Sequence, residues 1–203
     1  FSDAPPWGWA WRQGRATLLA SLFDLCFPLF EFEKDFLESR SVNCRWSGHP
    51  LLSMLKGISP AVLGDPKDKV VALLPGSRRS EVRSLMPVLA ETAKGINERG
   101  FIPVFSVAPG LDEGTADLIR EGCRPWRSHE GPGAGLMAAS GMVIGASGTA
   151  AVEALILGRF MIVLYRASLS SWLTYKALVR TRWISIPNVL AGSELYPDRK
   201  SVV

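Results

Sequence analysis

The feature of this sequence that most constrains its fold is an alternation of short apolar segments with amphipathic helical segments from residue 70 onward. The stretch VVALLPGSRRSEVRSLMPVLAETA (70–93) shows the pattern: an apolar run, a Pro-Gly-Ser break, then apolar residues at helical spacing. The positions that share one helical face are Val82, Leu85, Met86, Leu89, Ala93 and Ile96. Strands are predicted at 70–74, 101–107, 142–145 and 160–165, and helices at 80–98, 112–121, 148–157 and 170–180. Such alternation is typical of α/β chains with a doubly wound parallel sheet.

The residues before this pattern are predicted to belong to a different domain. Helices are expected at 12–24 and 31–40, a short buried strand near 25–29, and a strand at 43–52 that ends in a turn. Residues 56–69 are rich in Gly, Pro, Asp and Lys, which is linker composition. We therefore expect one domain over residues 1–57 and a second over residues 58–197.

Composition excludes several classes of protein. The 203 residues carry a formal net charge of +4, and no basic stripe indicates a nucleic-acid partner. Three widely spaced cysteines and two histidines form neither a disulfide framework nor a metal-ligand pattern, and they favour a reducing compartment. The uncharged run at 131–152 is mostly small residues broken by turns, so we interpret it as buried helix, strand, turn and helix rather than a membrane span.

Two strand ends combine small residues with polar ones, and ligands bind at such ends in doubly wound sheets. In the first, LLPGSRRSE (73–81), Gly76 permits a tight turn, and Ser77, Arg78 and the first helical amides can surround an anion such as a phosphate. The alternative is an ordinary helix cap by Ser80 with solvated arginines.

The second strand end is IGASGTAAVEAL (144–155), where Ser147, Gly148 and Thr149 lead into a helix. Glu153 follows among apolar residues, and a lone carboxylate there needs a partner. It could accept hydrogen bonds from sugar hydroxyls, or it could pair with Arg78, Arg79 or Arg159. Two anion-binding helix starts in one sheet suggest a nucleotide diphosphate, without a Walker loop.

A third candidate is ISIPNVLAG (184–192), in which Pro187-Asn188 is first of all a turn signal. The amide of Asn188 could instead contact a base or a sugar.

Five blocks of this sequence together resemble one known family. WAWRQGR (9–15), WSGHPLL (46–52), LLPGSRRSEV (73–82), ASGTAAVEAL (146–155) and ISIPNVLAG (184–192) occur in the order, and at about the spacing, of the lipid-A-disaccharide synthase family. LLPGSR or SGTA alone would be weak, whereas five blocks in order are specific. The resemblance covers nearly the whole chain, to about Pro197.

The resemblance implies a glycosyltransferase of the GT-B arrangement, with two Rossmann-like domains, that is incomplete in this chain. Such an enzyme transfers diacylglucosamine from UDP-2,3-diacylglucosamine to 2,3-diacylglucosamine 1-phosphate (lipid X), forms the β-1,6 lipid A disaccharide and releases UDP. The reaction inverts the anomeric centre and uses no metal or other cofactor. The resemblance also implies a peripheral membrane enzyme at the cytoplasmic face of the inner membrane of Gram-negative bacteria.

The resemblance also assigns roles to the candidate residues. Arg78 would stabilise charge on the leaving UDP, while Gly76 and Ser77 belong to the same donor-binding turn. Ser147, Gly148 and Thr149 would hold the diphosphate. Glu153 would bind the ribose hydroxyls, and Asn188 would line the donor pocket.

The same resemblance predicts a fragment that lacks both termini, including the general base, and that is inactive by itself. The last six residues, DRKSVV (198–203), depart from the family pattern and match translated sequencing adapter, so we expect a non-native tail. The alternatives are another UDP-sugar GT-B enzyme, such as a UDP-N-acetylglucosamine 2-epimerase or the peptidoglycan glycosyltransferase, and a non-catalytic nucleotide- or lipid-binding module. The motifs do not indicate an oligomeric state.

Overall fold

A computed structural model describes residues 2–3, 15–167, 183 and 185–202 of the chain. The chain divides into two compact units, the first formed by residues 1–56 and 169–182 and the second by residues 57–168 and 183–203. The helix expected at 170–180 and nearly all of the motif at 9–15 lie outside the described residues.

The first unit is small and mostly helical where it is described. Its elements are β1 (Ser2–Asp3), α1 (Arg15–Leu22), β2 (Cys26–Phe27), α2 (Glu31–Glu38) and α3 (Leu51–Met54). Its buried cluster consists of Ala16, Leu19, Cys26, Leu37 and Val42. The strand expected at 43–52 is wrong: Cys44 forms one isolated bridge with Cys26, after which Gly48 turns the chain at φ 92° and α3 begins.

The second unit carries the alternation that the sequence predicts. Its strands are β3 (Val70–Leu74), β4 (Ile102–Val107), β5 (Arg127–Glu130), β6 (Met142–Ala146), β7 (Phe160–Ala167) and β8 (Asp198–Val202). Its helices are η1 (Lys67–Lys69), α4 (Arg79–Glu98), α5 (Glu113–Gly122), α6 (Gly133–Ala138), α7 (Thr149–Ile156) and α9 (Ile186–Ala191). The interpretation of 131–152 as helix, strand, turn and helix is confirmed by α6, β6 and α7.

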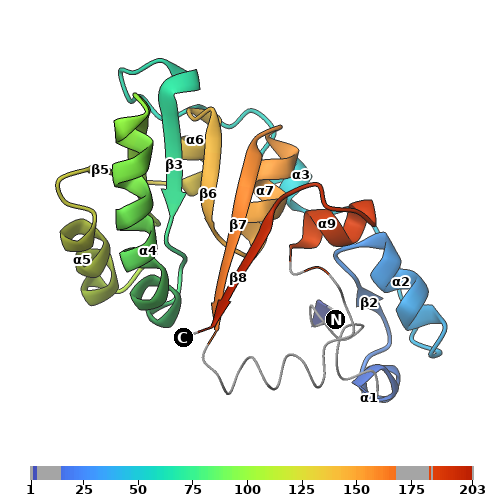
Figure 1. Cartoon of the computed structure of the whole chain (residues 1–203). Coiled ribbons are helices and arrows are strands. Elements are labelled where there is room, and N and C mark those ends of the chain that lie inside the picture. Colours follow the sequence, from blue (N-terminus) through green and yellow to red (C-terminus); the bar gives the residue numbers. More distant parts are fainter. Residues whose placement is uncertain (1, 4–14, 168–182, 184, 203) are drawn as a thin grey trace. The chain divides into compact units, whose positions relative to one another are not determined.

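The six strands form one parallel sheet in the order β5-β4-β3-β6-β7-β8. Figure 1 shows α4 and α5 on one face of this sheet and α6 and α7 on the other. The predicted fold class, α/β with a Rossmann-like doubly wound sheet, is confirmed.

The main core of the second unit lies between the sheet and α4. All six positions of the predicted apolar helix face are buried, and Val82, Leu89 and Ala93 are fully inaccessible to solvent. They pack with Leu73 of β3, Phe105 of β4 and apolar residues of α5 in one cluster. Burial of this face anchors α4, and with it the turn that precedes the helix.

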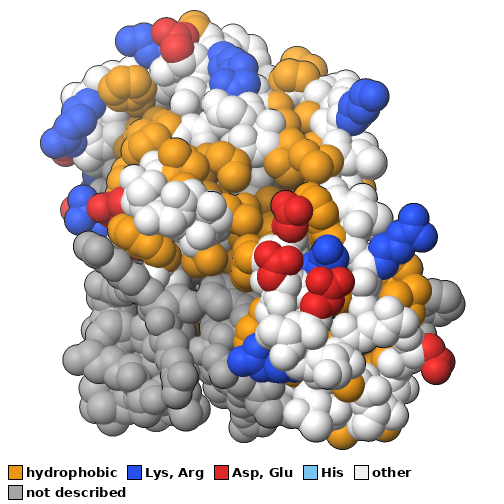
Figure 2. All heavy atoms as spheres, turned by 90° about the vertical axis from the view of Figure 1, so that its right-hand side faces the viewer, with side chains coloured by type: hydrophobic (Ala, Val, Ile, Leu, Met, Phe, Trp, Pro, Cys, Tyr) orange, Lys and Arg blue, Asp and Glu red, His pale blue; other side chains and the backbone are white. Residues whose placement is uncertain are grey.

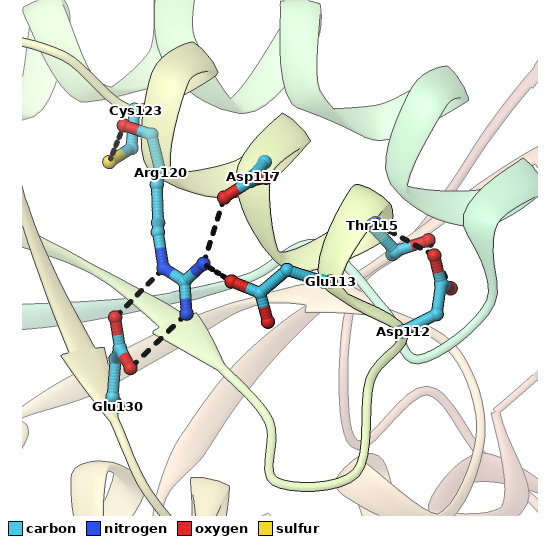
Figure 3. A network of polar contacts seen from close by, with 7 residues as sticks. All are labelled: Asp112, Glu113, Thr115, Asp117, Arg120, Cys123 and Glu130. Atoms are coloured by element: carbon cyan, nitrogen blue, oxygen red, sulfur yellow. Dashed lines mark hydrogen bonds and ion pairs between the residues drawn. The ribbon is translucent and has the colours of Figure 1, made fainter.

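The edge strand β5 is not among the predicted strands, because its sequence, RSHE, has no apolar alternation. Pairing with β4 forms it, and ion pairs hold it at both ends. Arg127 pairs with Asp65, and Arg120 of α5 binds Glu130 at 2.9 Å together with Glu113 and Asp117 (Figure 3). Long-range polar contacts therefore define a strand that local periodicity does not indicate.

The opposite edge, β8, covers five of the six residues expected to form a tail. It pairs in parallel with β7, with Asp198 opposite Val163. Just before this pairing, the Val163 N–H donates to the Pro197 carbonyl at 3.0 Å. The polar sequence DRKSV again shows no strand pattern, and the pairing depends on the exposed backbone of β7.

Across the part of the chain that the structure describes, none of the helices has the length and apolar character needed to cross a bilayer.

Candidate functional site

The two candidate turns follow neighbouring strands at the centre of the sheet. Chain order runs outward from β3 through β4 to β5 on one side and from β6 through β7 to β8 on the other, so the direction reverses between β3 and β6. At the carboxyl ends of these strands Leu74 is paired with Gly145. A Cβ on Gly145 would lie 2.4 Å from the Leu74 carbonyl oxygen, so only glycine permits this approach. Ligands of open α/β sheets bind at such a reversal.

The turn between β3 and α4 depends on Gly76, whose φ is 112°. A Cβ at Gly76 would lie 3.4 Å from the Ala146 Cβ, which places this turn against the end of β6. It would also lie 2.7 Å from Glu81 Oε2. The two predicted segments therefore meet, and Glu81 lies inside the first of them.

Glu81 is a site residue that the sequence reasoning did not single out. Its Oε2 accepts the N–H groups of Ser77 at 3.3 Å and Arg78 at 3.4 Å, and its Oε1 accepts Arg78 Nη1 at 2.7 Å. Arg78 is the N-cap of α4, so the proposed cap by Ser80 is wrong, because Ser80 lies inside the helix. A glutamate three residues after the N-cap is the signal that could have revealed this contact.

The cations near this turn differ in how they are held. The Arg78 side chain is 77% exposed and pairs with Glu81, whereas Arg79 pairs with Asp112 at 3.6 Å. Arg166 of β7, which no sequence signal indicated, donates from Nη1 to the Ser84 carbonyl of α4 at 2.9 Å. Its buried Nε has no hydrogen-bond partner among the described residues. Arg78, on the turn itself, is thus more exposed than Arg79, whose side chain is 51% exposed.

The turn between β6 and α7 is open to solvent at its tip. Gly148, the N-cap of α7, has φ 140°, and a Cβ there would meet no atom of the described residues within 4 Å. Gly148 and Thr149 are exposed, and Ser147 is half-buried with its N–H donated to the Leu164 carbonyl at 3.2 Å. Within the described part of the chain, no side chain caps α7. Its first amides therefore remain available to an anion in front of the turn.

Glu153 lies on α7 one turn beyond this helix start and is half-buried. Burial raises the pKa of its carboxyl group. Among the described residues it makes no ion pair with Arg78, Arg79 or Arg159, so the structural alternative for this carboxylate is wrong. An uncompensated, partly buried carboxylate is costly, and it suits a ligand that supplies hydroxyl donors.

Asn188 is placed differently from the expectation. The predicted turn at Pro187-Asn188 is wrong, because both residues lie in α9. The Asn188 side chain is fully buried; its Nδ2 donates to the Tyr196 carbonyl at 2.7 Å, and its Oδ1 accepts the N–H groups of Leu195 and Tyr196 at 2.8 and 2.7 Å. These three hydrogen bonds occupy the Asn188 amide within the chain. A ligand contact by Asn188 therefore stays a prediction, and the hydrogen bonds do not support it.

The strand order of this six-stranded parallel sheet reverses between β3 and β6, and a glycine turn leads from each of these two strands into a helix. This arrangement defines the Rossmann class of α/β proteins. Comparison with known proteins gives the narrower assignment. The profile of the lipid-A-disaccharide synthetase family matches residues 5–200, and this chain belongs to that family.

Individual relatives agree with this assignment. The chain is 33% identical over 210 residues to a lipid-A-disaccharide synthase of Acinetobacter baylyi, 36% over 205 residues to one of Pseudomonas aeruginosa and 34% over 203 residues to one of Myxococcus xanthus. These alignments cover 94–95% of the chain and 53% of each relative. The chain thus spans about half the length of the curated relatives it matches.

Proposed function

We propose that this chain is the donor-binding part of a glycosyltransferase that condenses UDP-2,3-diacylglucosamine with lipid X to the β-1,6 lipid A disaccharide and releases UDP. Family membership supports this reaction over a UDP-N-acetylglucosamine 2-epimerase or a peptidoglycan glycosyltransferase. The observation that carries the proposal is the meeting of the two glycine turns where the order of the sheet reverses. The proposal assigns no general base to this chain, and we expect no turnover from the chain alone.

In this proposal the diphosphate of the donor binds in front of α7. Among the residues that the structure describes, no side chain caps this helix start and no atom lies within 4 Å of a Cβ placed at Gly148. The amides that follow Gly148 and the hydroxyl groups of Ser147 and Thr149 would donate to phosphate oxygens, with the positive end of the helix dipole behind them. No metal is required for this contact.

Arg78 would supply the charge that the reaction needs. When the sugar–phosphate bond breaks, negative charge builds on the β-phosphate of the leaving UDP. A guanidinium at the neighbouring turn can neutralise that charge through paired hydrogen bonds. Arg78 is exposed and lies on the turn formed by Gly76 and Ser77, so it can reach a ligand above the β6–α7 turn.

Glu153 would accept hydrogen bonds from the ribose hydroxyls, which would give its half-buried carboxylate the partner that the described residues do not supply. The family resemblance places Asn188 in the donor pocket. Because its side-chain amide is bonded to the Tyr196 backbone, Asn188 would contribute to that pocket only by holding α9 in position.

We further propose that the protein works as a peripheral enzyme at the cytoplasmic face of the inner membrane, since both substrates carry acyl chains. The net charge of +4 favours an anionic lipid surface. Hydrophobic side chains are visible at the surface in the view of Figure 2, with charged groups among them. Exposed apolar residues of the second unit include Phe160, Leu190 and Leu195, each at least 45% accessible. Cosedimentation with anionic lipid vesicles, compared with neutral ones, tests this placement.

Calorimetric titration of UDP tests the donor site. Loss of a charge-assisted contact in Arg78→Ala should weaken UDP binding by about 1.5–3 kcal/mol, or roughly 10- to 150-fold. Arg83→Ala is the matched control, because Arg83 is an exposed arginine of the same helix. A folded wild-type chain that fails to bind UDP, or an Arg78→Ala chain that binds it equally well, would contradict the proposal. UDP binding without transfer in a complete gene product would favour the non-catalytic alternative.

A further inference from the structure

The inner side of the β3–α4 turn already holds an anion, the carboxylate of Glu81. Three donors converge on it: the N–H groups of Ser77 and Arg78 and the Arg78 guanidinium, at 3.3, 3.4 and 2.7 Å. This is the arrangement that a phosphate oxygen would require at the same turn.

The turn is shaped around this carboxylate. Gly76 has φ 112°, and a Cβ there would lie 2.7 Å from Glu81 Oε2 and 2.9 Å from Glu81 Cβ. Any other residue at position 76 would both strain the backbone and push Glu81 outward. Gly76 therefore does more than permit a turn: it makes room for the glutamate.

We infer that Glu81 is an internal competitor of the ligand, a positioning residue that occupies the phosphate-binding donors of the β3–α4 turn until a phosphate displaces it. The inference rests on the proposed donor site. One N–H group cannot be donated fully to two anions at once, so a phosphate that takes the Ser77 and Arg78 amides and Arg78 Nη1 must release Glu81 from them.

The exposure of the two side chains allows this exchange. The Arg78 side chain is 77% exposed and can turn toward a ligand, and the Glu81 side chain is 29% exposed and can move outward into solvent. The contacts to be broken are an ion pair between side chains three residues apart and two long amide hydrogen bonds. Such contacts are weak enough to be exchanged and strong enough to lower the affinity for a phosphate.

The inference predicts that removing the charge of Glu81 strengthens anion binding. Glu81→Gln keeps an oxygen that can cap α4 but competes less for a cation. In a titration of the 203-residue chain with inorganic pyrophosphate, followed by ¹⁵N amide shifts, we expect Glu81→Gln to bind about two- to fivefold more tightly than the wild type. The largest shifts should belong to the amides of Ser77 and Arg78.

The matched control is Glu91→Gln on the same helix. Glu91 forms an equivalent ion pair with Lys94 at 2.8 Å, about three turns away from Glu81. The Glu91→Gln substitution removes the same charge without changing the β3–α4 turn. The pyrophosphate affinity of this variant should therefore equal that of the wild type.

Equal or weaker pyrophosphate binding by Glu81→Gln would overturn the inference, because a carboxylate that only caps the helix would change stability and not affinity. Urea unfolding of both variants measures that structural effect separately. Parallel titration with UDP distinguishes the two proposals. If Glu81→Gln binds pyrophosphate more tightly but does not bind UDP, the internal competitor stands and the donor assignment fails.

Discussion

Replacing Asn188 with alanine separates two roles for this residue. In the structure its side-chain amide joins α9 to the segment before β8 through hydrogen bonds to Leu195 and Tyr196. Asn188→Ala removes all three bonds and leaves the carbonyl and N–H of Tyr196 without partners. If the residue instead serves only a ligand, the same change should leave the fold intact.

The magnitude follows from the groups left behind. A buried backbone donor or acceptor without a partner costs about 1–3 kcal/mol. Leu195 is 45% exposed, so water can replace the acceptor of its N–H, whereas Tyr196 is 4% exposed. The two groups of Tyr196 together predict a loss of about 2–6 kcal/mol in the free energy of unfolding.

Urea unfolding followed by circular dichroism measures this loss. Leu190→Ala is the control, because Leu190 lies on the same helix but is 45% exposed, and its change should be within about 0.5 kcal/mol. A loss below about 1 kcal/mol for Asn188→Ala would refute the reasoning. If such a stable variant also lost affinity for UDP, the ligand role of Asn188 would be the correct one.

Two further predictions concern the centre of the sheet. Burial raises the pKa of Glu153, so its contribution to stability is fully present below the ordinary value of 4.5 and is lost as the pH rises through the raised pKa. Glu153→Gln should therefore raise the melting temperature of the protein at pH 7 but not at pH 4. A lower melting temperature of the variant at pH 7 would reveal a stabilising partner of the carboxylate. Gly145→Ala would place a Cβ 2.4 Å from the Leu74 carbonyl oxygen and should cost about 1–3 kcal/mol or more in urea unfolding. Gly133→Ala, whose Cβ would make only an ordinary contact at 3.6 Å, should cost nothing, and equal losses for the two would argue against the close approach of β3 and β6.

The elements that bury an apolar face were predictable from the sequence. β3 spans the predicted residues, and the predicted face of α4 is the buried one. β5 and β8 were not predictable, because RSHE and DRKSV are polar and become strands only through pairing with β4 and β7. Apolar periodicity marks elements with a buried side, and an edge strand of polar residues has none to show.

The candidate site was predictable in part for the same reason. Small residues after an apolar run mark both turns locally, so Gly76 and Gly148 could be found from the sequence. The contact of Glu81 with the first turn is also local, since it follows the spacing of a capping box. That Glu153 has no ion-pair partner among the described residues could not be found in this way, because Arg78 and Arg79 lie far along the chain and the position of Arg159, after the end of α7, depends on tertiary packing.

The sequence by itself thus determined the strands and helices that bury an apolar face, the inward face of α4 and the two glycine turns, because each depends on residues close to one another in the sequence. The tertiary structure decided which strands are neighbours, and so that the ends of β3 and β6 meet. It also decided that the Asn188 amide is occupied inside the chain and that polar segments close both edges of the sheet. These features depend on hydrogen bonds and packing between residues distant in sequence, and local patterns do not record them.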